Sequence, residues 1–341
     1  MRGVASGQLR PIVASMASSA IPLSATVEQH PEQQYLDLMR TIWQSGSERA
    51  DRTGVGTRSV FGAMLRFDLR AGAMPLLTTK RVYWKTATRE LLWFLTGSTN
   101  IRPLVLQGVK IWNEWPHARY VRETGNHISL DDFVARIAAD EVFAAKWGDL
   151  GPVYGKQWVD WPTYRYRPDG LYEKGEGINQ VAAVIESLRS SPGSRRHIIE
   201  GWNVAELDRM ALPPCHKTYQ FHVAGDGPQA GNGARLNCLL YQRSCDVALG
   251  LPFNLWSAAL LTRMIASQVG MQPGELVWMG GDVHLYLNHA HLIEEQLSRQ
   301  PQGHPRLEIT RTPETIFDYT IDDFVVHDYA PLPPISAPVA V

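Results

Sequence analysis

The chain of 341 residues is poor in cysteine, with only Cys215, Cys238 and Cys245. An odd number of cysteines without CxxC spacing supports neither a disulfide framework nor a zinc site. We therefore expect a cytoplasmic protein in a reducing compartment that binds no metal. Each cysteine is then either a small buried apolar residue or a reactive thiol.

Net charge and long apolar runs are also lacking. A net charge of −1 gives the chain no general attraction for nucleic acid or for an anionic membrane. The apolar run at residues 255–269 is interrupted by polar side chains and is too short to span a bilayer, so we expect a buried helix there. Membrane insertion and nucleic-acid binding are not indicated, and an anionic substrate needs a local cluster of cations.

Acidic residues are absent from residues 1–27, which are rich in Ala and Ser and contain Arg2 and Arg10. This composition is loosely similar to that of an organelle transit peptide, but the apolar residues are scattered, without a continuous run. We favour a disordered N-terminal extension over residues 1–30, or an overlong start assignment.

Apolar residues are abundant, at 44% of the chain, which is enough for a large core. A first helix is predicted from near Pro31 to a stop at Gly46, and further helices at about residues 84–96, 180–189, 255–269 and 285–299. Strands are predicted at about residues 61–69, 197–199, 219–224, 235–241 and near Arg306 and Phe317. In the strand at 61–69 the apolar odd-numbered residues, beginning with Phe61, are expected on the buried face. Segments at about 117–147, 164–177 and 225–233 are expected to be surface insertions. The prediction is one α+β domain over residues 31–341.

Cys215 lies in Leu212-Pro213-Pro214-Cys215-His216, where two prolines lead into an expected strand. If Cys215 and His216 both lie in that strand, their side chains point to opposite faces, so His216 is a poor base for the thiol. Nearby arginines would favour the thiolate instead, because an opposite charge stabilises the ionised form. The pattern favours a nucleophilic Cys215 activated by arginines.

Arginines occur in three compact places, at Arg52, Arg195-Arg196 and Arg243. A guanidinium group binds phosphate through paired donors, and Ser244 adds a hydroxyl donor beside Arg243. Any one of these arginines could equally be a solvated surface charge. Arg243 differs because it follows Leu239-Leu240-Tyr241 on an apolar strand, where a charge requires an anionic partner.

Glu90 lies on an otherwise apolar helix. It either pairs with a cation or, with a pKa raised by burial, exchanges protons near neutral pH. Trp112 and Trp115 are either core aromatics or walls for a flat heteroaromatic ligand. Asn254 either caps the helix expected from Leu255 or reads a base, since its one acceptor and two donors match the N3–H and O4 of uracil.

Taken together, these segments resemble the thymidylate synthase family from about Gln34 to Val341. The stretches that carry the resemblance are Asp51-Arg52-Thr53-Gly54, Thr78-Thr79-Lys80-Arg81, Glu90-Leu91-Leu92-Trp93-Phe94-Leu95, Gly148-Asp149-Leu150-Gly151-Pro152-Val153-Tyr154-Gly155, Pro214-Cys215-His216, Gln242-Arg243-Ser244-Cys245-Asp246, Gly250-Leu251-Pro252-Phe253-Asn254, Gly281-Asp282 with His284 and Tyr286, and Ala337-Pro338-Val339-Ala340-Val341.

The resemblance implies reductive methylation of dUMP to dTMP. The co-substrate 5,10-methylenetetrahydrofolate gives the one-carbon unit and a hydride and leaves as dihydrofolate. Attack of the Cys215 thiolate on C6 of uracil would make C5 nucleophilic. Asn254 would stabilise the pyrimidine, Glu90 would manage proton transfers through ordered water, and Tyr154 would assist proton removal from C5.

The resemblance also implies the family's fold, a large twisted mixed sheet packed by helices, with one sheet face forming a homodimer interface. The residues expected to bind dUMP are Arg52, Arg243 and Ser244 at the phosphate, His284 and Tyr286 at the ribose hydroxyl, Asp246 and Asn254, with Arg195 and Arg196 reaching across from the partner subunit. The residues expected at the folate are Ile111, Trp112, Trp115, Asp246 and Gly250, with the C-terminal segment ending at Val341 closing over it. Arg243 and Asp246 are also expected to take part in catalysis.

Some features depart from the family pattern. Asn113 stands where an aspartate is common, and Lys217 and Trp256 occupy positions that are usually smaller or apolar. These departures concern the folate pocket and surface contacts rather than the reaction.

Three alternatives remain. A uracil nucleotide hydroxymethylase of the same fold would quench the methylene intermediate with water, although Trp112 and the complete C-terminal segment favour methylation. A cysteine hydrolase would need a histidine base and an orienting group at Cys215, and no such signature is present. An RNA-binding role lacks a basic aromatic platform.

Overall fold

A computed structural model of the chain describes residues 29–51, 54–225 and 233–338. Contacts between residues divide the chain into two units, and the fold below is that of the second, Pro31–Val341. The predicted sites Arg52 and Val341 lie outside the described residues, as do residues 1–28 of the predicted N-terminal extension and most of the Gly-rich segment at 225–233.

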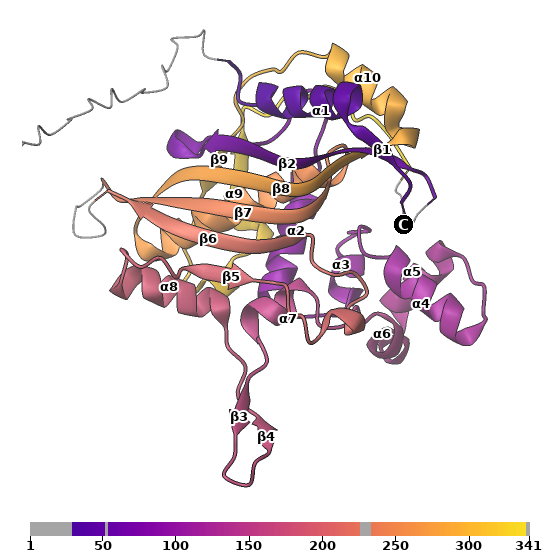
Figure 1. The fold of residues 1–341 in the computed structure, drawn as a ribbon, viewed down its shortest axis with the longest axis vertical. Coiled ribbons are helices and arrows are strands. Elements are labelled where there is room, and N and C mark those ends of the chain that lie inside the picture. Colours follow the sequence, from indigo (N-terminus) through magenta and orange to yellow (C-terminus); the bar gives the residue numbers. More distant parts are fainter. Residues whose placement is uncertain (1–28, 52–53, 226–232, 339–341) are drawn as a thin grey trace, which may run out of the picture. The chain divides into compact units, whose positions relative to one another are not determined.

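A six-stranded mixed sheet forms the centre of this unit (Figure 1). Its strands are β1 (Ser47–Arg49), β2 (Thr57–Asp68), β5 (Ile198–Glu200), β6 (His216–Ala224), β7 (Arg235–Asp246) and β8 (Gln272–Tyr286). They lie in the order β1-β2-β8-β7-β6-β5, with β7 and β8 parallel and all other neighbours antiparallel. The predicted α+β fold with a large mixed sheet is confirmed.

The longest helix covers the middle of this sheet. It is α9 (Gly250–Val269), which packs on β7 and β8 and is buried along most of its length. Helix α2 (Trp84–Leu95), which carries Glu90, packs against α9, while α1 (Gln33–Ser45) and α10 (Ala290–Ser298) pack against each other, and α1 also contacts β2 and β8. Helix α8 (Gln180–Ser190) lies against β5. The predicted buried helix at 255–269 is therefore confirmed, although it begins at Gly250.

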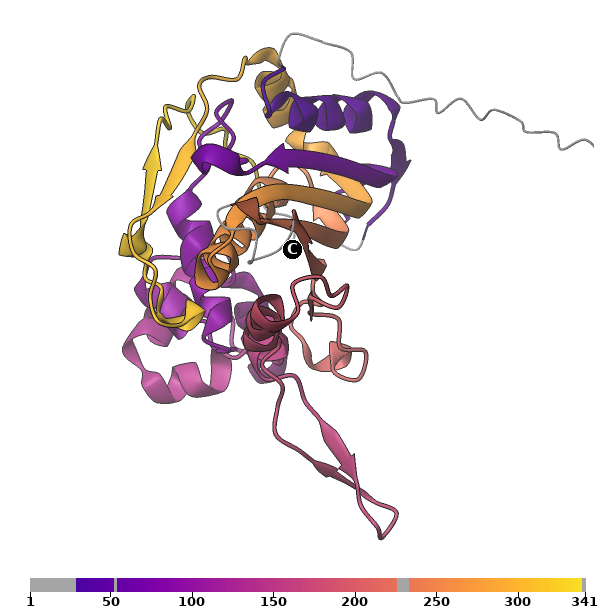
Figure 2. The ribbon, with the colours of Figure 1, turned by 90° about the vertical axis from the view of Figure 1, so that its left-hand side faces the viewer.

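Shorter elements surround this core. They are α3 (Arg102–Leu106), α4 (Glu114–Thr124), α5 (Leu130–Ala139), α6 (Glu141–Trp147), α7 (Tyr154–Val159), the strand pair β9 (Arg306–Ile309) and β10 (Phe324–His327), the hairpin β3 (Tyr164–Tyr166) and β4 (Tyr172–Lys174), and short 3-10 turns at Arg70–Gly72, Leu207–Arg209, Leu287–His289, Ile316–Asp318 and Ile321–Asp323. Helices α4 to α6 have an aromatic core of their own, in which the rings of Tyr120, Phe133, Phe143 and Trp147 lie with centroids 5.0 to 5.7 Å apart. The β3–β4 hairpin projects from this unit (Figure 2) and is exposed throughout.

Several boundary predictions are wrong. The strand β8 was not predicted, and the helix expected at 285–299 begins only at Ala290. The final strand pair lies at β9 and β10, whereas Phe317 lies in a 3-10 turn. Phe61 is 90% exposed rather than buried. Its neighbour Gly62 has a φ of +83°, a backbone conformation that favours glycine.

Candidate active site

Cys215 lies immediately before β6, at the end of the loop that contains the two prolines. Its backbone N–H donates to the hydroxyl of Tyr154 at 2.7 Å, and its carbonyl accepts from the backbone N–H of Arg243 at 2.9 Å. The other two cysteines are buried, which raises the pKa of Cys238 to about 12 and that of Cys245 well above its usual range. Cys215 alone is partly exposed, so it is the accessible thiol of the three.

Arg243 clamps the same loop from β7. Its Nε donates to the carbonyl of Pro214 at 2.8 Å, and a terminal nitrogen donates to the carbonyl of Pro213 at 2.7 Å. The guanidinium also lies over the ring of Trp202, 5.1 Å from its centroid. Two carbonyl oxygens and an aromatic face therefore stabilise this charge within the chain, and the expected anionic partner stays a prediction.

His216, the first residue of β6, is buried. Its ring stacks on that of Tyr154 with centroids 4.2 Å apart, and its Nδ1 lies 3.1 Å from the hydroxyl of Tyr219. Burial lowers the pKa of His216 to about 3, so the ring is neutral near pH 7. Cys215 precedes the strand rather than lying in it, but the prediction that His216 is a poor base agrees with this packing.

Glu90 faces the same cluster from α2. Its Oε1 accepts a hydrogen bond from the indole N–H of Trp112 at 2.7 Å. Burial raises the pKa of Glu90 to about 7, against the opposing effect of the Trp112 hydrogen bond. The Trp112 ring lies 6.0 Å from that of Tyr154 and 5.4 Å from that of Trp115. Burial, followed by the charge of Cys215, raises the pKa of Tyr154 well above its usual range.

Asn254 lies in the first turns of α9 and is not a helix cap. Its Oδ1 accepts from Nε2 of Gln242 at 2.9 Å, and Oε1 of Gln242 accepts from the indole of Trp278 at 2.9 Å. Gln242 therefore fixes the amide of Asn254 with its NH2 group turned away from β7. Sequence analysis did not single out Gln242, although it begins the stretch that contains Arg243.

The ends of β7 and β8 bring further predicted residues together. Ser244 lies opposite Asp282, and Asp246 lies opposite His284. The rings of His284 and Tyr286 are 5.4 Å apart, nearly at right angles. Oδ1 of Asp246 accepts from the backbone N–H groups of Ala248 and Leu249 at 2.9 and 3.2 Å, which places the carboxylate before the start of α9.

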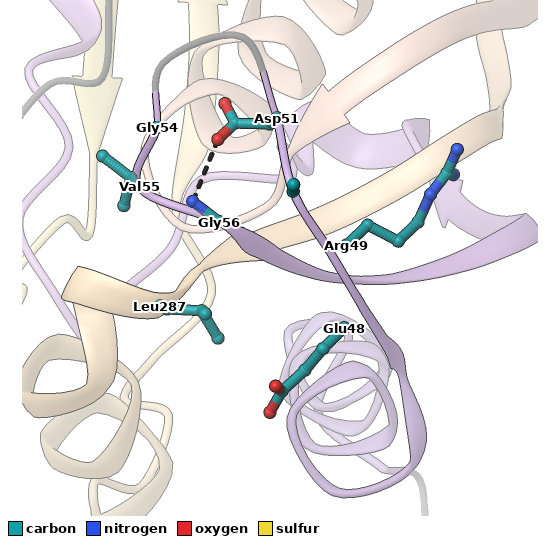
Figure 3. A pocket seen from close by; sticks show the side chains of 8 residues that line it. Glu48, Arg49, Asp51, Gly54, Val55, Gly56 and Leu287 are labelled. Carbon is teal, nitrogen blue, oxygen red and sulfur yellow. Dashed lines mark hydrogen bonds between the residues drawn. The ribbon is translucent and has the colours of Figure 1, made fainter.

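A pocket of about 310 Å³ lies beside the loop between β1 and β2, and not at Cys215. Figure 3 shows the Asp51 carboxylate accepting from the backbone N–H of Gly56, at 2.9 Å, while the side chain of Arg49 extends away from the loop. Leu287 borders the pocket directly after Tyr286 at the end of β8. The loop that contains Arg52 thus adjoins the strand that carries His284 and Tyr286.

Comparison with known proteins agrees with this arrangement. The family model described as thymidylate synthase matches residues 33–341. The chain belongs to the thymidylate synthase family. It is 71% identical to a thymidylate synthase of Novosphingobium aromaticivorans, over 92% of this chain and 98% of that protein. It is 66% identical to one of Sphingopyxis alaskensis and 58% identical to one of Rhizorhabdus wittichii, each over 92% of this chain and over 98% and 99% of those proteins.

Membership of the thymidylate synthase family confirms the predicted enzyme class, a methyltransferase that uses 5,10-methylenetetrahydrofolate as co-substrate. It gives no support to the hydroxymethylase alternative. Among the described residues, no group of three or more His, Cys, Asp or Glu side chains could hold a metal ion. No helix in the described part of the chain is long and apolar enough to cross a membrane.

The remaining residues predicted from the family lie at or near the starts of α4, α9 and β5. Ile111 lies just before α4, Trp115 lies in α4, and Gly250 begins α9. Arg195 and Arg196 are exposed just before β5, and among the described residues neither side chain forms an ion pair.

Proposed function

We propose that the chain converts dUMP to dTMP through covalent catalysis by Cys215. The thiolate attacks C6 of uracil, and C5 of the resulting enolate then attacks the methylene carbon of the folate. C5 then loses its proton, and the bond between the methylene carbon and the folate breaks. Hydride transfer from the folate to that carbon gives the methyl group and dihydrofolate, and Cys215 leaves C6. The clamped loop with a single accessible thiol is the observation that carries this proposal.

Glu90 is suited to the proton transfers of this reaction. With a pKa of about 7 it is part protonated and part ionised near neutral pH, so it can give a proton and take it back. The Trp112 hydrogen bond holds one carboxylate oxygen and leaves the other for water or substrate. Tyr154 keeps its proton at neutral pH and assists proton removal from C5 through its hydroxyl.

Asn254 reads the uracil ring in this proposal. Because Gln242 donates to Oδ1, the amide of Asn254 presents its NH2 donor to O4 and a remaining lone pair of Oδ1 to N3–H. Asp246 stays near the base at the start of α9, where the folate is also expected together with Ile111, Trp112, Trp115 and Gly250.

The phosphate is assigned to Arg52, Arg243 and Ser244, and the sugar hydroxyl to His284 and Tyr286. Arg195 and Arg196 complete the phosphate site from a second copy of the chain. An apolar stripe supports such a homodimer, since the exposed Met64 on β2 pairs with the exposed Met279 on β8, and Met279 pairs with Tyr241 on β7. Covering this sheet face in a two-fold interface would remove the stripe from water. We place the dimer in the cytoplasm.

The C-terminal segment is proposed to close over the folate. Two histidines already hold its described part. Nε2 of His289 donates to the carbonyl of Pro338 at 2.8 Å, and Nε2 of His291 donates to that of Ser336 at 2.7 Å. These contacts lie beside Tyr286, whose ring centroid is 5.5 Å from that of His289.

The nucleophile is tested by following dihydrofolate absorbance with dUMP and methylenetetrahydrofolate. Cys215→Ser should abolish turnover and leave dUMP binding largely intact, because the hydroxyl is a far weaker nucleophile at neutral pH. Cys238→Ala, a change at a buried thiol on β7, is the matched control and should keep turnover. Retained turnover in Cys215→Ser would exclude the covalent mechanism.

The dimer is tested by sedimentation and by mixing variants. Met64→Glu should shift the protein towards monomer and inactivate it, because it places a charge in the apolar stripe. Mixing Cys215→Ser chains with Arg196→Ala chains should restore activity in the heterodimers that carry one intact site. A fully active monomer would contradict the proposed role of Arg195 and Arg196.

A further inference from the structure

Asp282 lies between two side chains from distant parts of the sequence. Its Oδ1 is 3.0 Å from Nδ1 of His284, and its Oδ2 is 3.0 Å from a guanidinium nitrogen of Arg49. Asp282 and His284 are two residues apart on β8, so their side chains leave the same face of the strand. Arg49 is the last residue of β1. None of the roles proposed above uses Asp282.

The contact with Asp282 decides which ring nitrogen of His284 carries the proton. A carboxylate only accepts hydrogen bonds, so Nδ1 of His284 must donate, and in the neutral ring Nε2 then keeps a lone pair. Nε2 has no hydrogen-bond partner among the described residues, and the side chain is 12% exposed. A neutral His284 is therefore arranged to accept a hydrogen bond at Nε2 and not to donate one.

The neighbouring strand places this acceptor within the proposed nucleotide site. β7 runs parallel to β8 with Ser244 opposite Asp282 and Asp246 opposite His284. The ring of Tyr286 lies 5.4 Å from that of His284, on the side where β8 meets the loop that contains Arg52.

We propose that Asp282 is a positioning residue that holds His284 in the Nδ1–H form, so that Nε2 accepts from the 3′-hydroxyl of the bound nucleotide. The inference rests on the placement of the sugar hydroxyl at His284 and Tyr286 proposed above. It makes the site selective for nucleoside monophosphates with a free 3′-hydroxyl, because a 3′-deoxy sugar leaves the acceptor without its donor.

Arg49 orients the second oxygen of the Asp282 carboxylate. Arg49 also lines the pocket beside the loop between β1 and β2 (Figure 3), so the ion pair links β8 to the start of that loop. The two side chains are 62% and 38% exposed, and ion pairs of this kind contribute little. Substituting Asp282 should therefore change the selectivity for a free 3′-hydroxyl more than substituting Arg49.

Kinetics with two substrates test the proposal. The substrates are dUMP and 2′,3′-dideoxyuridine monophosphate, and the readout is the ratio of their kcat/KM values. The wild-type ratio is expected to be about 10 or more, since the hydrogen bond exists for only one of them. Asp282→Ala should lower it to about 2, mainly through the KM for dUMP, and Arg49→Ala should change it by less than about twofold.

Glu275→Ala is the matched control. Glu275 lies on the same strand and pairs across to Arg66 of β2 at 2.7 Å with similar exposure, and no histidine pairs with it among the described residues. Its loss should leave the ratio at the wild-type value. If Asp282→Ala loses the same factor on both substrates, Asp282 is merely structural and the proposal fails. A wild-type ratio near 1 would instead show that the 3′-hydroxyl does not bind at His284, and the proposal would fail for that reason.

A second measurement does not need the alanine variant to fold. In wild-type protein with ¹⁵N-labelled histidine, long-range ¹H–¹⁵N spectra should show neutral His284 protonated at Nδ1, with His284→Gln assigning the signal. Asp282→Asn offers a donor as well as an acceptor, so it should move part of the population to the Nε2–H form and lower the substrate ratio. Protonation at Nε2 in the wild type would overturn the proposal.

Discussion

The loop before β6 and the β3–β4 hairpin are both excursions from the sheet, yet they are held in opposite ways. The loop that carries Cys215 is fixed by groups distant in sequence, through the hydroxyl of Tyr154 and three hydrogen bonds from Arg243. The hairpin is held by local contacts, such as the rings of Tyr166 and Tyr172 at 5.3 Å and the exposed Arg167–Asp169 ion pair at 2.8 Å.

The two sets of contacts differ in how much free energy they contribute. Partly buried hydrogen bonds between distant segments, two of them charge-assisted, fix the position of a reacting atom, and losing one partner leaves polar groups unsatisfied. Exposed local contacts add little, because water replaces them. Substitutions should therefore have effects that fall steadily from the Cys215 loop to the hairpin, and the following experiments test that order.

Arg243→Ala should have the largest effect of these substitutions. It removes a proposed phosphate ligand and both side-chain hydrogen bonds that hold the Cys215 loop, so kcat/KM for dUMP should fall roughly 10³-fold, or about 4 kcal/mol. Arg243→Lys keeps the charge but not the planar fork, and should lose about 10- to 100-fold. Steady-state kinetics measure both losses.

Arg235→Ala is the control for Arg243. Arg235 is exposed at the other end of the same strand, and its loss should change kcat/KM by less than about twofold. Equal losses in the two variants would mean that β7 responds as a whole and that the clamp has no special role.

Glu90→Gln should separate activity from stability. The pKa of about 7 lies above the ordinary value of 4.5, so the folded state binds more protons than the unfolded state between these values, and stability falls as pH rises through this range. A shift of that size is worth about 3 kcal/mol above pH 7. Glutamine keeps an acceptor for Trp112 and removes the buried charge.

The variant should therefore match the wild type in melting temperature near pH 5 and exceed it near pH 8, while kcat falls roughly 100-fold. Thermal denaturation across pH and steady-state kinetics measure the two effects. A melting-temperature difference that does not change with pH would show that Glu90 is not a buried titrating group.

Gln242→Glu should have a moderate effect. A carboxylate at this position still accepts from Trp278 but cannot donate to Oδ1 of Asn254, so the amide of Asn254 should turn over. The Kd for dUMP should rise about 10-fold and the preference over dCMP should narrow. Calorimetry with both nucleotides measures this. Trp278→Phe removes the indole donor to Gln242 but keeps the Gln242 donation to Asn254, so it should leave the preference intact. A narrowed preference in this variant would show that the preference depends on core packing.

Much of the fold follows from local pattern. The periodic segments around Glu90 and Gln180 form α2 and α8, and the strands on either side of the Gly-rich loop form the β6–β7 hairpin. β8 was missed because Pro273, Gly274, Gly280 and Gly281 indicate turns. The glycines are needed in a central strand, since a Cβ at Gly280 would lie 2.4 Å from the Trp278 ring and one at Gly281 would lie 2.9 Å from the carbonyl of Arg243.

The site residues likewise include some that local motifs predict and some that they do not. The predictions of Cys215, Glu90, Arg243 and Asn254 depended on motifs within short stretches of sequence. Gln242 and Asp282 act through partners 12 and 233 residues away, at Asn254 and Arg49, which only the folded sheet brings within reach. A sequence pattern contains residue types and spacing, but not the tertiary contacts that fix an amide or a tautomer.

Shortening the hairpin should have the smallest effect. Replacing residues 164–174 by Asn-Gly keeps the base, where Gly175 N–H donates to the Thr163 carbonyl at 2.9 Å and Trp161 and Ile178 exchange backbone hydrogen bonds at 2.9 Å. A two-residue turn of this type matches the twist of paired strands. In the described part of the chain, the rings of Tyr166 and Tyr172 contact each other and not the Cys215 loop. Their removal should therefore keep kcat/KM within about twofold and the melting temperature within a few degrees. Kinetics, calorimetry and sedimentation check this, and loss of the dimer would instead assign the hairpin to the interface between copies.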